Sequence, residues 1–127
     1  MSTIVVLEDD YTLLDLYKDV LEIAHHTVYP ATTVQAVEEY FDQNTADLII
    51  ADLRVGATSA EATIHAIKQI HTRYNVPVVL ISAQMMVYEE MCHDAGLTNT
   101  LTKPFPNGVL IQIAEKVIAE ANQSAGS

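Results

Sequence analysis

Five short apolar runs, each followed by a segment with helical periodicity, constrain the fold of this chain more than any other feature. The runs are rich in β-branched residues and lie at residues 3–7, 26–29, 47–51, 76–81 and 99–101. The segments that follow have apolar residues three or four positions apart, at about residues 11–24, 32–41, 59–73, 85–95 and 107–120. Continuously apolar runs are typical of parallel strands that are buried on both faces. The alternation therefore predicts an α/β fold with a five-stranded parallel sheet and helices on both faces.

The arrangement that fits this alternation is flavodoxin-like, a (βα)5 three-layer sandwich whose sheet has the strand order 2-1-3-4-5. A chain of 127 residues suits one domain, and its 50% hydrophobic content is enough for a full core. We expect the domain to span residues 1–121. The polar residues 122–127 are expected to form a tail, a linker or a remnant of cloning.

The charge and the cysteine content exclude several classes of protein. A net charge of −11, with six Lys and Arg residues, argues against direct binding to nucleic acid or to an anionic membrane surface. Cys92 is the only cysteine, so an internal disulfide is impossible and a reducing compartment fits best. The sequence also lacks an apolar run of about 18 residues. We therefore expect a cytoplasmic protein.

Polar side chains follow the ends of four predicted strands. Glu8 and Asp9 follow the first, Asp52 the third, Ser82 the fourth and Lys103 the fifth. The carboxyl ends of parallel strands lie at one edge of the sheet, where ligands bind in open α/β folds. One acid at a strand end is more often a loop carboxylate or a helix cap, but groups from four strands point to a site.

These residue types match the chemistry of a phosphoryl group. Carboxylates repel one another unless a cation neutralises them, and Mg²⁺ prefers carboxylate and water oxygens. Lys103 adds a fixed positive charge and Ser82 a hydroxyl donor. Asp52 is then the carboxylate that can attack phosphorus and form an acyl phosphate.

Over essentially its whole length the chain resembles the receiver domain of two-component response regulators. Four segments carry the resemblance in the family's order and spacing: Val6–Asp10, Ile50–Arg54, Leu80–Ala83 and Leu101–Phe105. The last of these resembles the family's Lys-Pro-Phe motif, in which the peptide bond before proline is usually cis. Each segment is a weak signal by itself, but the four together are specific.

The resemblance implies a role for each of these residues. Asp52 would accept a phosphoryl group from a histidine kinase or a histidine phosphotransfer domain, and Ser82 and Lys103 would bind the phosphoryl oxygens. Glu8, Asp9, Asp52 and the backbone carbonyl of Arg54 would hold Mg²⁺. The chain would then be a regulator that catalyses only its own phosphorylation and dephosphorylation, not an enzyme acting on other substrates.

The resemblance also predicts an output surface, and there the sequence departs from the family's pattern. Thr100 stands three residues before the lysine, where the family usually carries Tyr or Phe. Met85, Met86, Val87 and Tyr88 begin the fourth helix and cannot all face the core, so some apolar surface is expected to be exposed. A homodimer through the fourth helix, fifth strand and fifth helix is one use of this face.

Three functions remain open from the sequence. The first is the phosphorylation-dependent switch. The second is a phosphate-independent interaction module, which Thr100 keeps open although it is opposed by the intact set of site residues Glu8, Asp9, Asp52, Ser82 and Lys103. The third is a hydrolase with an aspartyl-phosphate intermediate, which would need a further acid or base after Asp52, where Arg54 is poorly suited. The sequence does not identify a kinase, a regulated process, an output domain or an oligomeric state.

Overall fold

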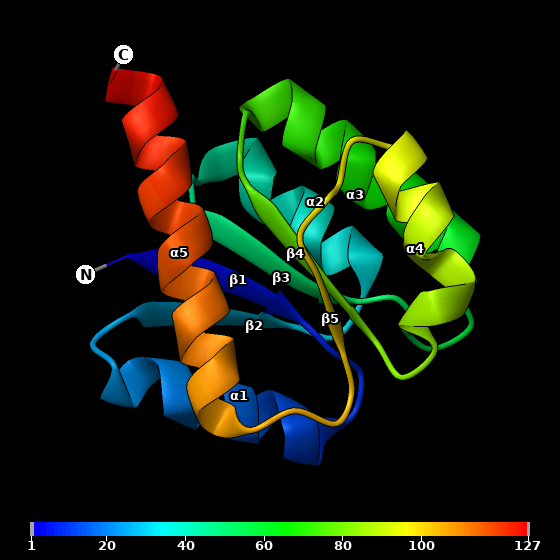
Figure 1. Ribbon diagram of the computed structural model, residues 1–127, viewed down its shortest axis with the longest axis horizontal. Coiled ribbons are helices and arrows are strands. Elements are labelled where there is room, and N and C mark those ends of the chain that lie inside the picture. The colour runs from blue at the N-terminus through cyan, green and yellow to red at the C-terminus, as the bar shows by residue number, and fades with distance from the viewer. Residues whose placement is uncertain (1, 127) are drawn as a thin grey trace.

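The computed structural model describes the backbone of residues 2–126 and the side chains of residues 2–123. Strands and helices alternate along the chain (Figure 1). The elements are β1 (Thr3–Leu7), α1 (Tyr11–Ile23), β2 (Thr27–Ala31), α2 (Val34–Gln43), β3 (Leu48–Asp52), α3 (Ala60–Tyr74), β4 (Val78–Ser82), α4 (Met85–Asp94), β5 (Thr100–Thr102) and α5 (Asn107–Gly126).

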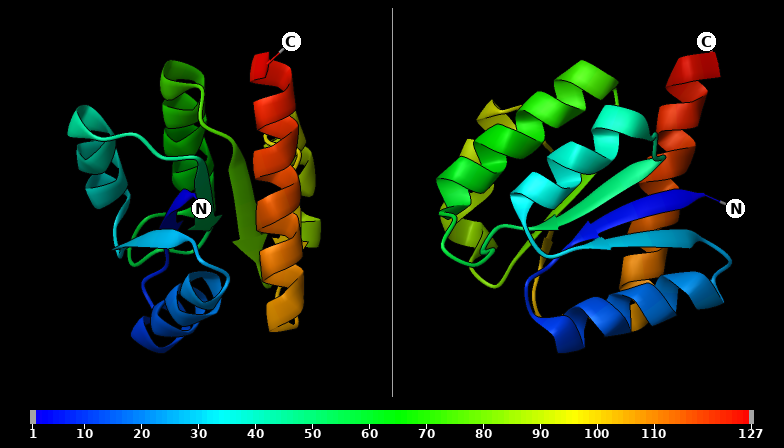
Figure 2. Two further views of the ribbon diagram at one scale, coloured as in Figure 1. Left: turned by 90° about the vertical axis from the view of Figure 1, so that its left-hand side faces the viewer. Right: turned by 180° about the vertical axis from the view of Figure 1, so that it is seen from behind.

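The five strands form one parallel sheet with the order β2-β1-β3-β4-β5, which confirms the predicted topology. Because successive side chains of a strand point to opposite faces, the apolar strands feed two separate cores. One core lies under α2, α3 and α4, and the other lies under α1 and α5. Figure 2 shows these two helical layers on either side of the sheet.

Side-chain caps start three of the helices. The Asp10 carboxylate accepts hydrogen bonds from the backbone N–H groups of Thr12 and Leu13 at 2.9 and 3.2 Å, and so begins α1. Thr33 caps α2, and Ser59 caps α3. The third acid after β1 is therefore a helix cap.

The element boundaries agree with the sequence prediction to within two residues, except at the end of α5. β2 extends to Ala31 with Pro30 inside it, which an edge strand tolerates because one side of its backbone has no partner strand. α5 was predicted to end near Glu120, but it continues to Gly126. No proline interrupts this stretch, and its alanines and glutamine favour helix. That residues 122–127 act as a tail or linker stays a prediction.

The topology decides where the candidate site lies. Glu8, Asp52, Ser82 and Lys103 stand at or just beyond the carboxyl ends of β1, β3, β4 and β5, at one edge of the sheet. None of the helices described in residues 2–126 is long and apolar enough to cross a membrane.

Candidate functional site

Two buried acids lie at the centre of this edge. Asp52 ends β3 with 5% of its surface exposed, and Glu8 follows β1 with 2% exposed. One Asp52 oxygen, Oδ1, accepts a hydrogen bond from the Arg54 backbone N–H at 2.7 Å. Glu8 Oε2 accepts one from the Asp10 N–H at 3.3 Å. Each acid thus has one oxygen engaged by backbone, and its other oxygen is available to a cation.

Lys103 supplies that cation. Its ammonium nitrogen Nζ donates to Glu8 Oε1 at 2.9 Å and also to Asp52 Oδ2. The lysine follows β5, and its backbone N–H donates to the Ser82 carbonyl at 3.0 Å. The Lys103–Pro104 peptide bond is cis, as the resemblance implied. The structure therefore brings together three of the predicted site residues, from the ends of three different strands.

Ser82 and Asp9 lie beside these three residues. Ser82 ends β4 and is 1% exposed, and its Oγ accepts a hydrogen bond from the Gln84 backbone N–H at 2.9 Å. Asp9 is exposed, and its Oδ2 accepts one from the Gly56 N–H at 2.6 Å. Gly56 has a φ of 58°, a left-handed conformation that glycine adopts without strain. Asp9 thus ties the end of β1 to the loop after β3.

The environment shifts the proton affinity of the central groups. Burial raises the pKa of Glu8 from 4.5 to about 7, against the opposing effect of its hydrogen bond from Lys103. Burial would also lower the pKa of Lys103, but its hydrogen bonds to Asp52 and Glu8 outweigh this and raise the pKa above its usual value. Lys103 therefore stays positively charged at neutral pH.

The oxygen atoms at this edge fit the ligand preference of Mg²⁺. Glu8, Asp9 and Asp52 offer carboxylates, and Arg54 offers a backbone carbonyl. Within residues 2–126, however, no three His, Cys, Asp or Glu side chains are already gathered around one point. Lys103 holds Glu8 and Asp52, whereas Gly56 holds Asp9. Metal binding would therefore compete with Lys103 and Gly56 for these oxygens.

The predicted output residues divide between the core and the surface. Met85 is 3% exposed and packs in the core under α4, whereas Met86 is 91% exposed. Tyr88 and Thr100 are half-buried. Val87, which belongs to the same predicted segment, is 70% exposed beside Met86. Met85 is thus a core residue, and Met86 and Val87, together with the less exposed Met91, provide the exposed apolar surface of α4.

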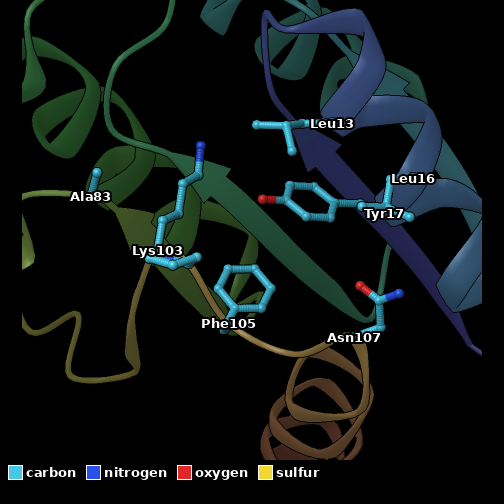
Figure 3. A pocket seen from close by; sticks show the side chains of 8 residues that line it. Leu13, Leu16, Tyr17, Ala83, Lys103, Phe105 and Asn107 are labelled. Atoms are coloured by element: carbon cyan, nitrogen blue, oxygen red, sulfur yellow. The ribbon is translucent and has the colours of Figure 1, made fainter.

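A hollow of about 320 Å³ adjoins the site, and the sequence analysis missed it (Figure 3). Its walls come from α1, from the segment that leads from β5 into the start of α5, and from the residue after β4. The lining residues are Leu13, Leu16, Tyr17, Ala83, Lys103, Pro104, Phe105 and Asn107. Helical spacing marked Tyr17 as a core residue, and nothing in the sequence could show that its ring meets Phe105.

Comparisons with known proteins agree on one family. The family model described as "Response regulator receiver domain" matches residues 4–115. Among curated proteins, the transcriptional regulatory protein VxrB of Vibrio cholerae is 31% identical over 110 residues, which cover 86% of this chain and 43% of VxrB. The sensory transduction protein BceR of Halalkalibacterium halodurans is 25% identical and is covered to 50%. This chain thus spans half or less of the length of these relatives.

Solved structures show the same fold. The non-phosphorylated receiver domain of HemR from Leptospira biflexa superposes with a TM-score of 0.80 at 25% identity, covering 94% of this chain and 95% of HemR's solved chain. The receiver domain of the Francisella response regulator 1452 gives a TM-score of 0.82 at 19% identity, covering 94% of this chain and 98% of its own.

Proposed function

Because the chain belongs to the response regulator receiver domain family, we propose that it is a signalling switch that accepts a phosphoryl group on Asp52. One observation carries the proposal: the carboxylate of Asp52 is nearly buried at the carboxyl end of the central strand, and the Lys103 ammonium is bonded to it. A buried acid with a fixed counter-charge is suited to nucleophilic attack on phosphorus.

Each neighbouring group then has a defined task. Asp52 Oδ2, the oxygen that faces Lys103, attacks phosphorus, while Oδ1 keeps its hydrogen bond from the Arg54 N–H. The Lys103 ammonium can move its contact from the Asp52 carboxylate to a negatively charged phosphoryl oxygen. The Ser82 hydroxyl can donate a hydrogen bond to another phosphoryl oxygen. Glu8, Asp9, Asp52 and the Arg54 carbonyl would hold Mg²⁺. When bound, the metal would supply positive charge that neutralises phosphoryl oxygens.

The proposed phosphodonor is a histidine kinase or a histidine phosphotransfer domain. α1 borders the site and exposes Asp15, Asp19 and Glu22 on its outer side. This negative surface would attract a partner with basic residues around its phosphohistidine and would speed their encounter. We place the exchange in the cytoplasm, where a reducing environment keeps a lone thiol such as Cys92 free.

Output is proposed to pass through α4, β5 and α5. Phosphorylation adds negative charge beside Ser82, which ends β4, and Lys103, which follows β5. β5 contacts α4, and β4 contacts α5. Met86 and Val87 are the apolar surface that a second copy or another target would cover.

A second candidate is a phosphate-independent interaction module. Thr100 favours it, because a half-buried threonine cannot fill the volume of the aromatic ring that the family usually carries at this position. In that case the site residues would be present but the output face would not respond to phosphorylation.

The deciding experiment is intact mass spectrometry after incubation with Mg²⁺ and acetyl phosphate. We expect one phosphoryl adduct that requires Mg²⁺ and is absent from Asp52→Asn, which keeps the size of the side chain but removes the nucleophile. A folded protein without an adduct from several donors would reject the switch and favour the interaction module.

A further inference from the structure

A second hollow lies at the opposite edge of the sheet, where the strands begin, and we call it the amino-edge hollow. It measures about 330 Å³, and its walls come from the residues just before β3 and β4, the end of α3 and the last turns of α5. In Figure 1 the end of α3, the start of β4 and the end of α5 all lie toward the top. The length of β3 separates this hollow from Asp52. The lining residues are Ala46, Asp47, His71, Asn75, Pro77, Ala121 and Asn122.

His71 presents one ring nitrogen to a further partner. It lies in the last turn of α3 and is half-buried. Its Nδ1 lies 2.7 Å from the Val76 carbonyl oxygen. Because a carbonyl oxygen only accepts hydrogen bonds, Nδ1 carries the proton, and Nε2 of the neutral ring then holds a lone pair. Histidines that bind metal ions almost always donate their other ring N–H in this way, which fixes the orientation of the ring.

Asp47 has the same arrangement with its two oxygens. Its Oδ2 accepts a hydrogen bond from the Thr3 backbone N–H at 2.8 Å, which leaves Oδ1 available. The Asp47 N–H donates in turn to the Thr3 carbonyl at 2.8 Å, so the residue is held against β1 through both its backbone and its side chain. Carboxylates that bind metal ions are likewise hydrogen-bonded. An imidazole and a carboxylate, each oriented by a backbone group, therefore line one hollow.

We propose that the amino-edge hollow binds Zn²⁺ through His71 Nε2 and Asp47 Oδ1. Zn²⁺ accepts imidazole nitrogen together with carboxylate oxygen, whereas Mg²⁺ prefers oxygen ligands alone. The side-chain amides of Asn75 and Asn122 line the same hollow, so their oxygens and water can complete the coordination. Asp47 is negatively charged, and the other lining residues carry no fixed positive charge, so the hollow favours a cation.

The ion would join elements of both helical layers. Asp47 precedes β3, His71 belongs to α3, and Asn122 belongs to the part of α5 beyond its predicted end near Glu120. Bound Zn²⁺ should therefore stabilise the last turns of α5. Its binding does not require phosphorylation of Asp52, which lies at the other edge of the sheet.

Isothermal titration calorimetry with Zn²⁺ tests the site, in excess Mg²⁺ so that the acids at the carboxyl edge are already engaged. His71→Asn is the decisive variant, because its side-chain N–H can still donate to the Val76 carbonyl while Nε2 is lost. Asp47→Asn keeps an oxygen that can accept from the Thr3 N–H but removes the charge. His65→Asn is the control, since His65 is exposed on the same helix and does not line the hollow.

We expect the wild-type chain to bind one Zn²⁺ ion. His71→Asn and Asp47→Asn should each weaken binding at least tenfold, because losing even a group that supports a ligand typically costs about 10- to 100-fold in metal affinity. His65→Asn should bind Zn²⁺ as the wild type does. Zn²⁺ should also slow amide hydrogen exchange at Ala121 and Asn122 in the wild type but not in His71→Asn.

A wild-type chain that binds no Zn²⁺, or equal affinity in the wild type and His71→Asn, would overturn the site. Binding that Asp52→Asn weakens and His71→Asn does not would place the ion at the carboxyl edge and would overturn it too. Neither result bears on the switch, because the phosphoryl adduct on Asp52 is measured with Mg²⁺ alone.

Discussion

At the scale of single residues, Glu8 differs most from an ordinary glutamate. It is almost fully buried, and burial raises its pKa to about 7. Between pH 4.5 and 7 the folded chain therefore holds a proton at Glu8 that the unfolded chain has released. Because the native state binds more protons in this window, the contribution of Glu8 to the free energy of unfolding falls as the pH rises.

This shift predicts the behaviour of Glu8→Gln in metal-free buffer with EDTA. Glutamine does not titrate, so the free energy of unfolding of the variant should not show the part of the decrease between pH 5 and 7.5 that comes from ionisation of Glu8. The wild-type free energy of unfolding should fall relative to that of the variant by roughly 2 kcal/mol across this range, as urea unfolding would measure. Glu38→Gln, on the exposed face of α2, is the control. Parallel curves for wild type and Glu8→Gln would contradict the raised pKa.

At the scale of elements, the three acids between β1 and α1 have three different roles. Glu8 bonds Lys103, Asp9 bonds the Gly56 amide, and Asp10 caps the helix. The sequence analysis assigned Glu8 and Asp9 to the metal site and gave Asp10 no role of its own. Each role depends on a partner that is distant in sequence or on the local geometry of the helix start.

The cap leads to a prediction for Asp10→Ala. Two backbone N–H groups lose their acceptor, so the free energy of unfolding should fall by about 1 kcal/mol, measured by urea denaturation. Asp15→Ala, at an exposed interior position of the same helix, should be neutral or slightly stabilising because alanine favours helix. If Asp10 is a cap rather than a metal ligand, the variant should also keep the Mg²⁺-dependent adduct on Asp52. Loss of the adduct in a folded variant would contradict this division of roles.

The elements also show how far the sequence could lead. Apolar runs and helical spacing were enough to predict all five strands, all five helices and the edge where Glu8, Asp52 and Lys103 meet, because buried parallel strands have a distinct pattern. The extension of α5 to Gly126 was missed, since a polar helical turn looks like a frayed end. The hollow was missed because the contact between Tyr17 and Phe105 joins residues 88 positions apart.

At the scale of the whole molecule, charge and apolar surface act against each other. Each chain carries a net charge of −11, so two copies repel. Met86 and Val87 nevertheless expose apolar surface on α4, where Glu89 and Glu90 are also exposed. Association through this face should therefore be weak at low salt and should strengthen as salt screens the charges.

For the proposed homodimer we expect the phosphorylated chain to associate in 0.5 M NaCl more strongly than the unphosphorylated chain, as sedimentation equilibrium would measure. Val87→Asp should weaken this association at least tenfold, because it places a charge in the apolar contact. Ile23→Asp, an equally exposed apolar site on α1, should leave association unchanged. If the phosphorylated chain stays monomeric at high protein concentration, the homodimer is rejected. A different protein would then be the proposed partner of this face.

The division of the interior into two cores determines how the effects of two substitutions on stability combine. The buried side chains under α1 and α5 form one cluster and those under α2, α3 and α4 form another, with the sheet between them. Substitutions on opposite faces should then have independent, additive effects on stability. The strand ends are different, because the strands border both cores. Asp52 and Ser82 therefore occupy the part of the molecule where a local chemical event can be felt by both helical layers at once.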